Sequence, residues 1–309
     1  MKELENVLIR PTDLDGYVCD PGLKKRLQDH VTAAKKRGKL PPHILLSGGP
    51  GTGKTTLALL IARMLNVPVL KFVGTELRKP VQLKDLFSFP ESGGILFIDE
   101  IHTVSKEVAE LLYPVMEDNT MSAIGNSKLQ LRLNSVMVIG ATTEPGTLEK
   151  PLVDRFTVKL SIPAYTTEQM ASIVWNMAQR HEVKYTPEAI LSIAALSKGV
   201  PRVAGNLLFQ INDSAVANDV TSVDEAYVAM QRQALGISAE GLDHTDAAIL
   251  RALAEVPTMG LDLLATIVGE DPSWISGVCE PYLIRKGYIT RTRMGRSLTD
   301  KGRELAARG

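Results

Sequence analysis

The residues best suited to chemistry form a glycine-rich segment, residues 48–55, which reads GGPGTGKT. Glycines let a backbone turn tightly and point N–H groups at phosphates, and the helix expected to follow adds its positive N-terminus. The segment is therefore predicted to be a P-loop, in which Lys54 reaches the β- and γ-phosphates of ATP and the Thr55 hydroxyl ligates Mg²⁺. The residues expected to bind the nucleotide here are Gly48, Gly51, Gly53, Lys54, Thr55 and Thr56.

A second candidate is the carboxylate pair Asp99 and Glu100, which follows the apolar run 95–98. An aspartate at the end of a buried strand holds Mg²⁺, and a glutamate beside it can orient and activate the attacking water. A solvated pair at a strand end is the ordinary alternative, but its position after a P-loop favours function. A glutamate at this place predicts hydrolysis of ATP and not binding alone.

The charge that develops on the transferred phosphate needs polar or cationic stabilisation. The residues that could supply it from outside these two motifs are Thr142, Thr143, Arg155 and Arg202. Each also has an ordinary structural interpretation, the threonines as caps of a strand end and the arginines as surface ion pairs. From their spacing alone, the ordinary interpretation is favoured.

Up to about residue 164, short apolar runs alternate with stretches whose apolar residues have helical spacing, and these elements must position the groups above. Apolar runs at 43–47, 67–72, 95–98 and 135–140 predict a parallel α/β sheet with polar groups past the carboxyl ends of its strands. Three helix-like stretches follow, 166–180, 186–197 and 203–217, with no strand signal. We therefore expect an α/β P-loop domain over residues 1–164 and a helical lid over residues 165–238.

The last part of the chain, residues 239–309, has a different pattern. Three short helical stretches precede the run 288–292 and a tight Met294-Gly295 turn. This order predicts a winged helix. Residues 285–308 hold eight Lys or Arg against two acidic residues, a balance of 8 − 2 = +6, whereas the whole chain has 35 of each sign. Such a patch could bind phosphates, and a basic solvated tail is the alternative.

Bulk composition narrows the class further. Hydrophobic residues make up 44% of the 309 residues, and no apolar run reaches 18 residues. The two cysteines, Cys19 and Cys279, lie far apart and form no zinc motif. We expect a soluble, cytoplasmic protein without membrane association.

Several longer motifs resemble the RuvB family, the AAA+ motors of bacterial Holliday-junction branch migration. The resemblance extends from Arg10 to Arg296, and its motifs are far more specific than a P-loop. They are ILFIDEIH (95–102), LYPVMED (112–118), GATT (140–143), PLVDRF (151–156), GED (269–271) and EPYLI (280–284). The implied fold is an AAA+ P-loop NTPase with a parallel sheet, a helical lid and a winged-helix DNA-binding domain.

The resemblance implies a role for individual residues. Arg155 would be an arginine finger that reaches the ATP of a neighbouring subunit, with Thr143 as first sensor and Arg202 as second. Adenine would be bound by Ile9, Arg10 and Tyr165, and Glu117 and Asp118 match further nucleotide-site positions. Arg291 and Arg296 match DNA-backbone contacts, and Arg293 stands beside Met294, where the family has its middle arginine. The family assembles as a hexamer around duplex DNA.

Departures from the family concentrate in one segment. Residues 119–133, NTMSAIGNSKLQLRL, are shorter and more polar than the family's hairpin for its partner RuvA, with a turn expected at Gly125-Asn126. Cys19-Asp20 replaces a Gly-Gln pair, and Val153 replaces an arginine. A RuvA-like adaptor or another DNA-processing protein is therefore left open as a partner.

Three functions are compatible with these observations. The first is a hexameric, ATP-driven translocase on duplex or four-way-junction DNA that promotes branch migration in recombination and repair. The second is an AAA+ loader that places a ring-shaped replication protein, a helicase or clamp, on DNA. The third is a protein remodeller whose winged helix binds protein.

Overall fold

The computed structural model describes residues 10–123 and 126–307, which form two compact units. The ATPase unit comprises Arg10–Gly48 and Gly53–Pro163. The C-terminal unit comprises Gly49–Thr52 and the described part of Ala164–Gly309, so it holds both the lid and the winged helix. The predicted domain limits at residues 164 and 238 stay a prediction.

A five-stranded parallel sheet forms the centre of the ATPase unit, with the order β2-β3-β6-β1-β7. Its strands are β1 (Ile44–Gly48), β2 (Val69–Val73), β3 (Gly94–Asp99), β6 (Val136–Thr142) and β7 (Val158–Ile162). The central strands β3 and β6 are buried almost throughout, because helices cover both faces. The expected α/β sheet is confirmed, and the order places the carboxyl ends of β1, β3 and β6 side by side.

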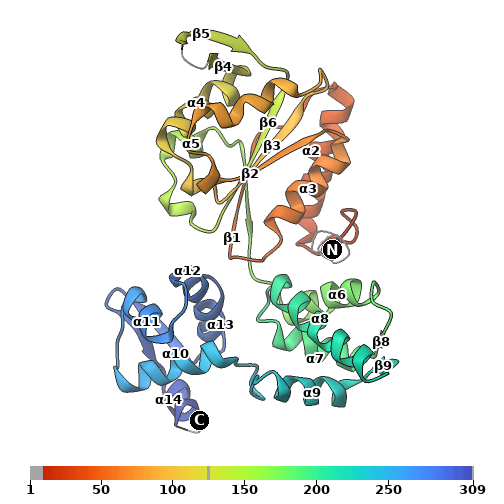
Figure 1. Ribbon diagram of the computed structural model, residues 1–309, viewed down its shortest axis with the longest axis vertical. Helices are drawn as coiled ribbons and strands as arrows, with labels where there is room; N and C mark the ends of the chain where they lie inside the picture. The colour runs from red at the N-terminus through yellow and green to blue at the C-terminus, as the bar shows by residue number, and fades with distance from the viewer. Residues whose placement is uncertain (1–9, 124–125, 308–309) are drawn as a thin grey trace. The chain divides into compact units, whose positions relative to one another are not determined.

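Helices α2 and α3 cover one face of this sheet, and α4 and α5 cover the other (Figure 1). Their bounds are α2 (Pro21–Arg37), α3 (Lys54–Leu65), α4 (Lys106–Asp118) and α5 (Lys150–Asp154). Short helical turns are η1 (Gly74–Glu76), η2 (Pro80–Ser88), η3 (Ile101–Thr103) and η4 (Pro145–Thr147). One buried cluster includes Leu112 and Val115 of α4 and Leu96 and Val138 of the sheet, so it holds α4 against the strands that end at the site.

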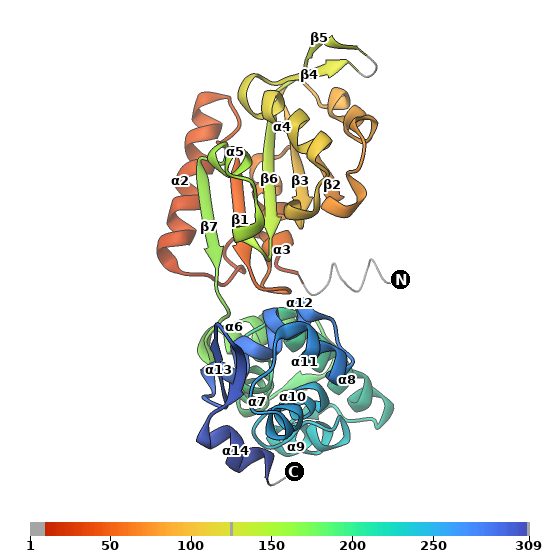
Figure 2. The same ribbon diagram turned by 90° about the vertical axis from the view of Figure 1, so that its left-hand side faces the viewer.

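A hairpin of β4 (Thr120–Ala123) and β5 (Asn126–Arg132) follows α4. It projects from the ATPase unit at the edge opposite the carboxyl ends of the strands (Figure 2). Gly125, half of the expected turn, lies outside the described residues. The described part of the diverged segment 119–133 therefore folds as a hairpin away from Lys54, Thr55, Asp99 and Glu100, although it directly follows Glu117 and Asp118.

The lid part of the C-terminal unit contains four helices within its described residues: α6 (Thr167–Ala178), α7 (Pro187–Leu196), α8 (Pro201–Ala217) and α9 (Glu225–Ala234). The sequence pattern missed α9, and the expectation of no strands was wrong. Two-residue strands β8 (Lys184–Tyr185) and β9 (Ser222–Val223) pair in parallel, too short to give a periodic signal.

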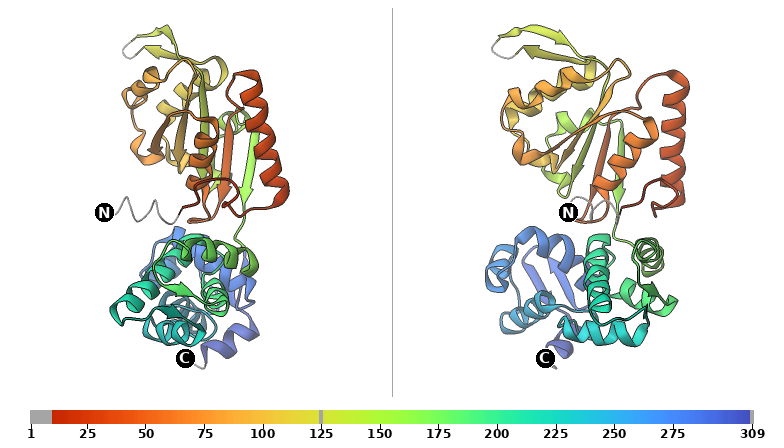
Figure 3. Two further views of the ribbon diagram at one scale, coloured as in Figure 1. Left: turned by 90° about the vertical axis from the view of Figure 1, so that its right-hand side faces the viewer. Right: turned by 45° about the vertical axis from the view of Figure 1, so that its right-hand side comes forward.

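The winged-helix part lies beside the lid in the C-terminal unit (blue beside green in Figure 3). Its elements are α10 (His244–Glu255), α11 (Leu261–Val268), α12 (Pro272–Trp274), η5 (Ile275–Cys279), α13 (Glu280–Arg285), β10 (Ile289–Thr292), β11 (Gly295–Leu298) and α14 (Asp300–Ala306). The antiparallel pair β10–β11 is the expected wing. No helix in the described ranges is long and apolar enough to cross a membrane.

Candidate nucleotide site and wing

The P-loop connects β1 to α3, as its sequence predicts. Gly51 and Gly53 have φ angles of 75° and 100°, a region that favours glycine. The side chain of Lys54 is buried, and its ammonium donates to the carbonyl of Gly48 at 2.8 Å. The lysine is thus folded back along the loop that would hold the phosphates.

Thr55 and Asp99, which are far apart in sequence, are in direct contact. The Thr55 hydroxyl donates to Oδ2 of Asp99 at 2.8 Å, and Oδ1 of Asp99 accepts from the backbone N–H of Glu100 at 3.2 Å. A hydroxyl and a carboxylate beside a phosphate-binding loop are oxygen donors of the kind that Mg²⁺ prefers. The residues present therefore fit the predicted ion.

Glu100 has an unusual backbone conformation, with φ 48° and ψ 51°. A non-glycine residue in this region costs of order 1–3 kcal/mol, and such strain clusters at functional sites. The backbone N–H and hydroxyl of Thr103 hold the turn by donating to the Glu100 carbonyl at 2.9 and 2.8 Å. Gly74 leaves room for it, because an added Cβ would lie 2.4 Å from the same carbonyl oxygen. Sequence reasoning missed Gly74, whose signal was a glycine directly after β2.

The carboxylate of Glu100 is oriented by the strand beside it. Its Oε2 accepts from the backbone N–H and hydroxyl of Thr143 at 3.0 and 2.9 Å. Nδ1 of His102 lies 3.3 Å from the same oxygen and 3.0 Å from the Thr142 hydroxyl. The predicted sensor Thr143 thus contacts the predicted glutamate. His102, which the sequence suggested packs or caps behind the acidic pair, belongs to this polar network.

Arg155 lies at the end of α5 and contacts the last turns of α4. Its guanidinium forms an ion pair with Glu117 at 2.7 Å, donates to the Pro151 carbonyl at 2.7 Å and lies 4.1 Å from the ring centre of Tyr113. Within the described residues it makes no hydrogen bond to the P-loop, Asp99 or Glu100. The ordinary interpretation as an ion pair therefore holds inside one subunit, and this leaves the predicted role in a neighbouring site open.

Glu117 and Asp118, both predicted at the nucleotide site, form the end of α4. The structure gives Glu117 a partner that the sequence did not suggest, namely Arg155. Asp118 is exposed. Tyr113 likewise was not singled out, although it stands in the LYPVMED motif.

Tyr165 and Arg202 contact the tip of the P-loop, which belongs to the same compact unit. The Tyr165 hydroxyl donates to the Thr52 carbonyl at 3.1 Å. The backbone N–H of Arg202, in the first turn of α8, donates to the Gly51 carbonyl at 3.4 Å. Arg10 is half-buried at the start of the described chain, and Ile9 lies outside the described residues.

On the wing, Arg291 and Arg296 face one another across β10 and β11 but differ in exposure. The Arg291 side chain is 59% exposed, with its guanidinium 3.7 Å from the carboxylate of Glu280, and Arg293 is also exposed. Arg296 is only 7% exposed, because both ends of its guanidinium bind the buried carboxylate of Glu280 at 3.0 Å. This geometry argues against the expected DNA contact of Arg296 and gives it a structural role.

The basic patch is accordingly smaller than the charge count of residues 285–308 suggested. Arg296 neutralises Glu280, and Arg308 lies outside the described residues, whereas Arg285 is exposed and keeps its charge while donating to the Lys198 carbonyl. Arg291 and Arg293 remain exposed on the wing, Arg291 sharing Glu280 at 3.7 Å, and Met294, at the turn between β10 and β11, is 86% exposed.

Comparison with known proteins matches three family models in chain order. Residues 9–162 match the Holliday junction DNA helicase RuvB P-loop domain, 165–238 the RuvB AAA lid domain, and 239–306 the RuvB C-terminal winged helix domain. Two curated relatives are named Holliday junction branch migration complex subunit RuvB. The protein of Bifidobacterium adolescentis is 37% identical over 96% of this chain and 84% of its own length, and that of Nitratiruptor sp. is 36% identical over 96% and 91%.

A solved structure of the Thermotoga maritima RuvB Holliday junction branch migration motor is similar over the same extent. It has a TM-score of 0.88 and 34% sequence identity, covering 97% of this chain and 98% of the other. Fold, site geometry and relatives agree, and the chain belongs to the RuvB family of AAA+ P-loop ATPases.

Proposed function

We propose that this protein is an ATP-driven motor that moves duplex DNA and promotes branch migration of Holliday junctions, acting as a cytoplasmic hexamer. The observation that carries the proposal is the contact of Glu100 with Thr143 beside the Thr55–Asp99 pair, in a chain that also exposes Arg291 on a wing. The first two contacts suit hydrolysis, and the wing offers a surface for phosphates. The relatives named as branch-migration subunits support the same conclusion.

In this proposal the residues divide the work of phosphoryl transfer. The loop glycines and Lys54 bind the phosphates, and Thr55 and Asp99 would hold Mg²⁺, which would supply charge neutralisation on the phosphate oxygens. Glu100 accepts the proton of the attacking water, and the two donors of Thr143 fix the carboxylate that does so. Tyr165 and Arg202 belong to the lid and contact the P-loop, so they link the position of the lid to the bound nucleotide.

The position of Arg155 is the reason to propose an oligomer. A finger arginine contributes about 10³–10⁵ in rate when it reaches the transferred phosphate. Within this subunit it instead contacts Glu117 and Tyr113. We therefore propose that each ATP lies between two subunits of a ring and that Arg155 completes the site of its neighbour.

One observation keeps the loader alternative in view. The β4–β5 hairpin is short and diverged where the family carries its adaptor contact, so its partner is open. An AAA+ loader for a ring-shaped helicase or clamp would keep the same ATPase site and change only this contact. A RuvA-like adaptor and another DNA-processing protein are both candidates for the hairpin.

A synthetic four-way junction distinguishes these functions. The purified protein with ATP and Mg²⁺ is expected to convert the junction into two labelled duplexes, and the junction should stimulate ATP hydrolysis. The Lys54→Ala variant serves as the control that cannot use ATP. Binding and stimulation without any branch migration, even with a RuvA protein added, would favour the loader. Failure to bind DNA at low salt would overturn both.

The three wing arginines are expected to fall into two groups when each is replaced by alanine. Arg291→Ala and Arg293→Ala should weaken binding to all DNA sequences and each reduce the salt slope, the dependence of log K on log salt, by about 1, because each removes a phosphate contact. Arg296→Ala should instead lower the free energy of unfolding by about 1–3 kcal/mol, since it removes both hydrogen bonds to the buried carboxylate of Glu280 and leaves it only the ion pair with Arg291 at 3.7 Å.

Salt titrations of DNA binding and denaturant unfolding measure the two effects separately. Arg251→Ala, at an exposed position of α10 in the same domain, is the matched control and should change neither. A fully stable Arg296→Ala variant with a reduced salt slope would show that Arg296 contacts phosphate after all.

A further inference from the structure

The joint between α7 and α8 contains two consecutive residues in the left-handed region, Lys198 (φ 56°) and Gly199 (φ 72°). The lysine side chain is almost fully enclosed, with 3% exposed. A buried ammonium is costly unless it is paired and hydrogen-bonded. The buried ammonium of Lys198 therefore needs partners, and the backbone conformation of the joint is kept because it places the side chain among them.

These partners belong to the winged helix, whereas Lys198 belongs to the lid. Its Nζ lies 2.5 Å from Oδ2 of Asp243 and 2.6 Å from Oδ2 of Asp246, at the start of α10. Asp246 is fully buried and Asp243 is 37% exposed. The Tyr282 ring of α13 lies 5.7 Å from the same ammonium. One lysine thus ties the lid to two helices of the winged helix.

The electrostatics agree with this geometry. Burial alone would lower the pKa of Lys198, but the two carboxylates outweigh burial and raise it above its ordinary value. Burial raises the pKa of Asp246 to about 6, although Lys198 acts in the opposite direction. Without the Lys198 cation, the fully buried carboxylate of Asp246 would lose the charge that offsets the cost of its burial.

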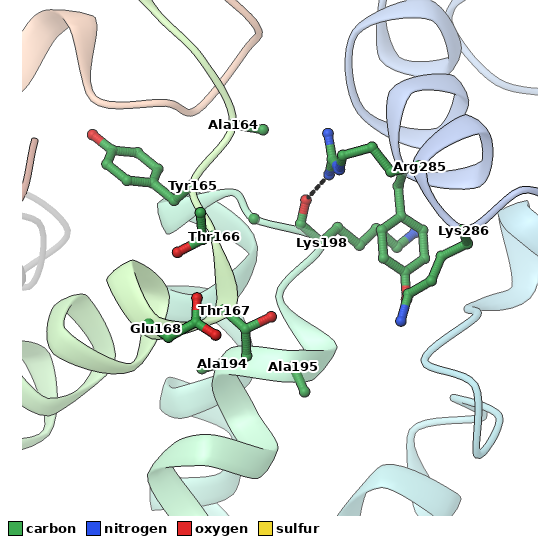
Figure 4. A pocket seen from close by; sticks show the side chains of 12 residues that line it. Ala164, Tyr165, Thr166, Thr167, Glu168, Ala194, Ala195, Lys198, Arg285 and Lys286 are labelled. Atoms are coloured by element: carbon green, nitrogen blue, oxygen red, sulfur yellow. Dashed lines mark hydrogen bonds between the residues drawn. The ribbon is translucent and has the colours of Figure 1, made fainter. Parts of the chain in front are cut away.

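The backbone of the joint makes two further connections. Arg285 of α13 donates to the Lys198 carbonyl at 2.7 Å across a cleft of about 400 Å³ (Figure 4). The Gly199 carbonyl accepts from the backbone N–H of Tyr165 at 2.9 Å. A Cβ added at Gly199 would lie 2.6 Å from the backbone carbonyl oxygen of Tyr165. Helix α8, which carries Arg202 in its first turn, starts two residues later.

We propose that Lys198 couples the nucleotide site to the winged helix, as a positioning residue that contacts neither ATP nor DNA. The inference rests on the proposed function, because it needs a DNA-bound wing and a nucleotide-reading lid. Tyr165 and Arg202 on one side, and α10 and α13 on the other, all attach to the joint Lys198-Gly199. A rotation of the lid on nucleotide exchange therefore carries the winged helix with it.

The coupling is measured as the ratio of junction-DNA dissociation constants with ADP and with a non-hydrolysable ATP analogue. Coupled sites typically differ by about 5–150-fold. In Lys198→Met, which shortens the unbranched side chain by one atom and removes its charge, this ratio should fall to within about twofold of one. DNA stimulation of ATP hydrolysis should be lost, while hydrolysis without DNA and affinity for ADP stay near the parent values.

Lys184→Met, an exposed lysine in β8 of the same lid, is the control and should keep the parent ratio. Asp243→Asn removes a partly exposed partner, so it serves if Lys198→Met does not fold, and it should lower the ratio in the same direction. Parent ratios in a folded Lys198→Met, or in Asp243→Asn where the former does not fold, would overturn the coupling role. A parent protein that fails to bind DNA or hydrolyse ATP would refute the proposed function instead.

Discussion

Arg155→Ala is expected to lower the kcat of ATP hydrolysis by about 10³–10⁵, the contribution of an arginine finger to phosphoryl transfer. The fold should tolerate the change, since Glu117, the partner left behind, is 55% exposed and stays hydrated. Exposed ion pairs contribute about 0–1 kcal/mol to stability. A large loss of rate at nearly unchanged unfolding free energy would therefore place the role of Arg155 in catalysis.

A mixing experiment shows whether the finger acts on the neighbouring subunit. Arg155→Ala subunits keep the P-loop but lack the finger, whereas Lys54→Ala subunits keep the finger but lack the lysine of the P-loop. Each variant alone should be inactive. Mixed rings contain interfaces that combine an intact P-loop with an intact finger, so mixing should restore a measurable part of the activity.

The control is Arg37→Ala, at an exposed position in the last turn of α2, which should keep the parent rate. A finger that served its own subunit would give no activity on mixing. An Arg155→Ala protein with a rate within tenfold of the parent would remove the argument for a shared site.

Local motifs carried most of what the sequence could predict. The P-loop depends on glycines and a lysine that are contiguous, and Asp99 stands directly after an apolar strand, so both positions follow from short segments. The parallel sheet then brings Asp99 to Thr55, because β3 and β1 flank β6 and the carboxyl ends of parallel strands lie at one edge. Prediction succeeded where chain order and strand order were enough.

Ion pairs between residues that are brought together only by folding could not be predicted from the sequence pattern. The ion pair of Arg296 with Glu280 joins the wing to the start of α13 and removes a cation that had been assigned to DNA. Lys198 and Asp246 pair between lid and winged helix, and neither stands in a motif that suggests the other. A charge count sums residues without their partners, so it overestimates a basic surface wherever a cation is buried.

Backbone strain was equally hidden. The left-handed conformation of Glu100 depends on hydrogen bonds from Thr103 and on the missing side chain of Gly74. These residues come from different segments, and only their packing reveals why the glutamate points at Thr143. The motif identified Glu100 as the catalytic group, whereas only the fold explained the orientation of its side chain.

Glu100→Gln is the second change with a large expected effect, a loss of about 10²–10⁴ in kcat, the range for a positioned general base. Glutamine keeps the shape of the side chain, and its carbonyl oxygen can still accept from the two donors of Thr143. It cannot take the proton of the attacking water. Because Lys54, Thr55 and Asp99 are untouched, nucleotide affinity should change by only a few-fold.

Single-turnover hydrolysis and the binding of a fluorescent ATP analogue separate these two quantities. Glu144→Gln is the matched control, since it makes the same change at an exposed carboxylate just past the end of β6 and should leave both values near the parent. If Glu100→Gln kept more than a tenth of the parent rate, the proton would have another acceptor. The strained turn at Glu100 would then need a different explanation. A variant that lost ATP binding together with its rate would instead assign Glu100 to holding the nucleotide and not to activating water.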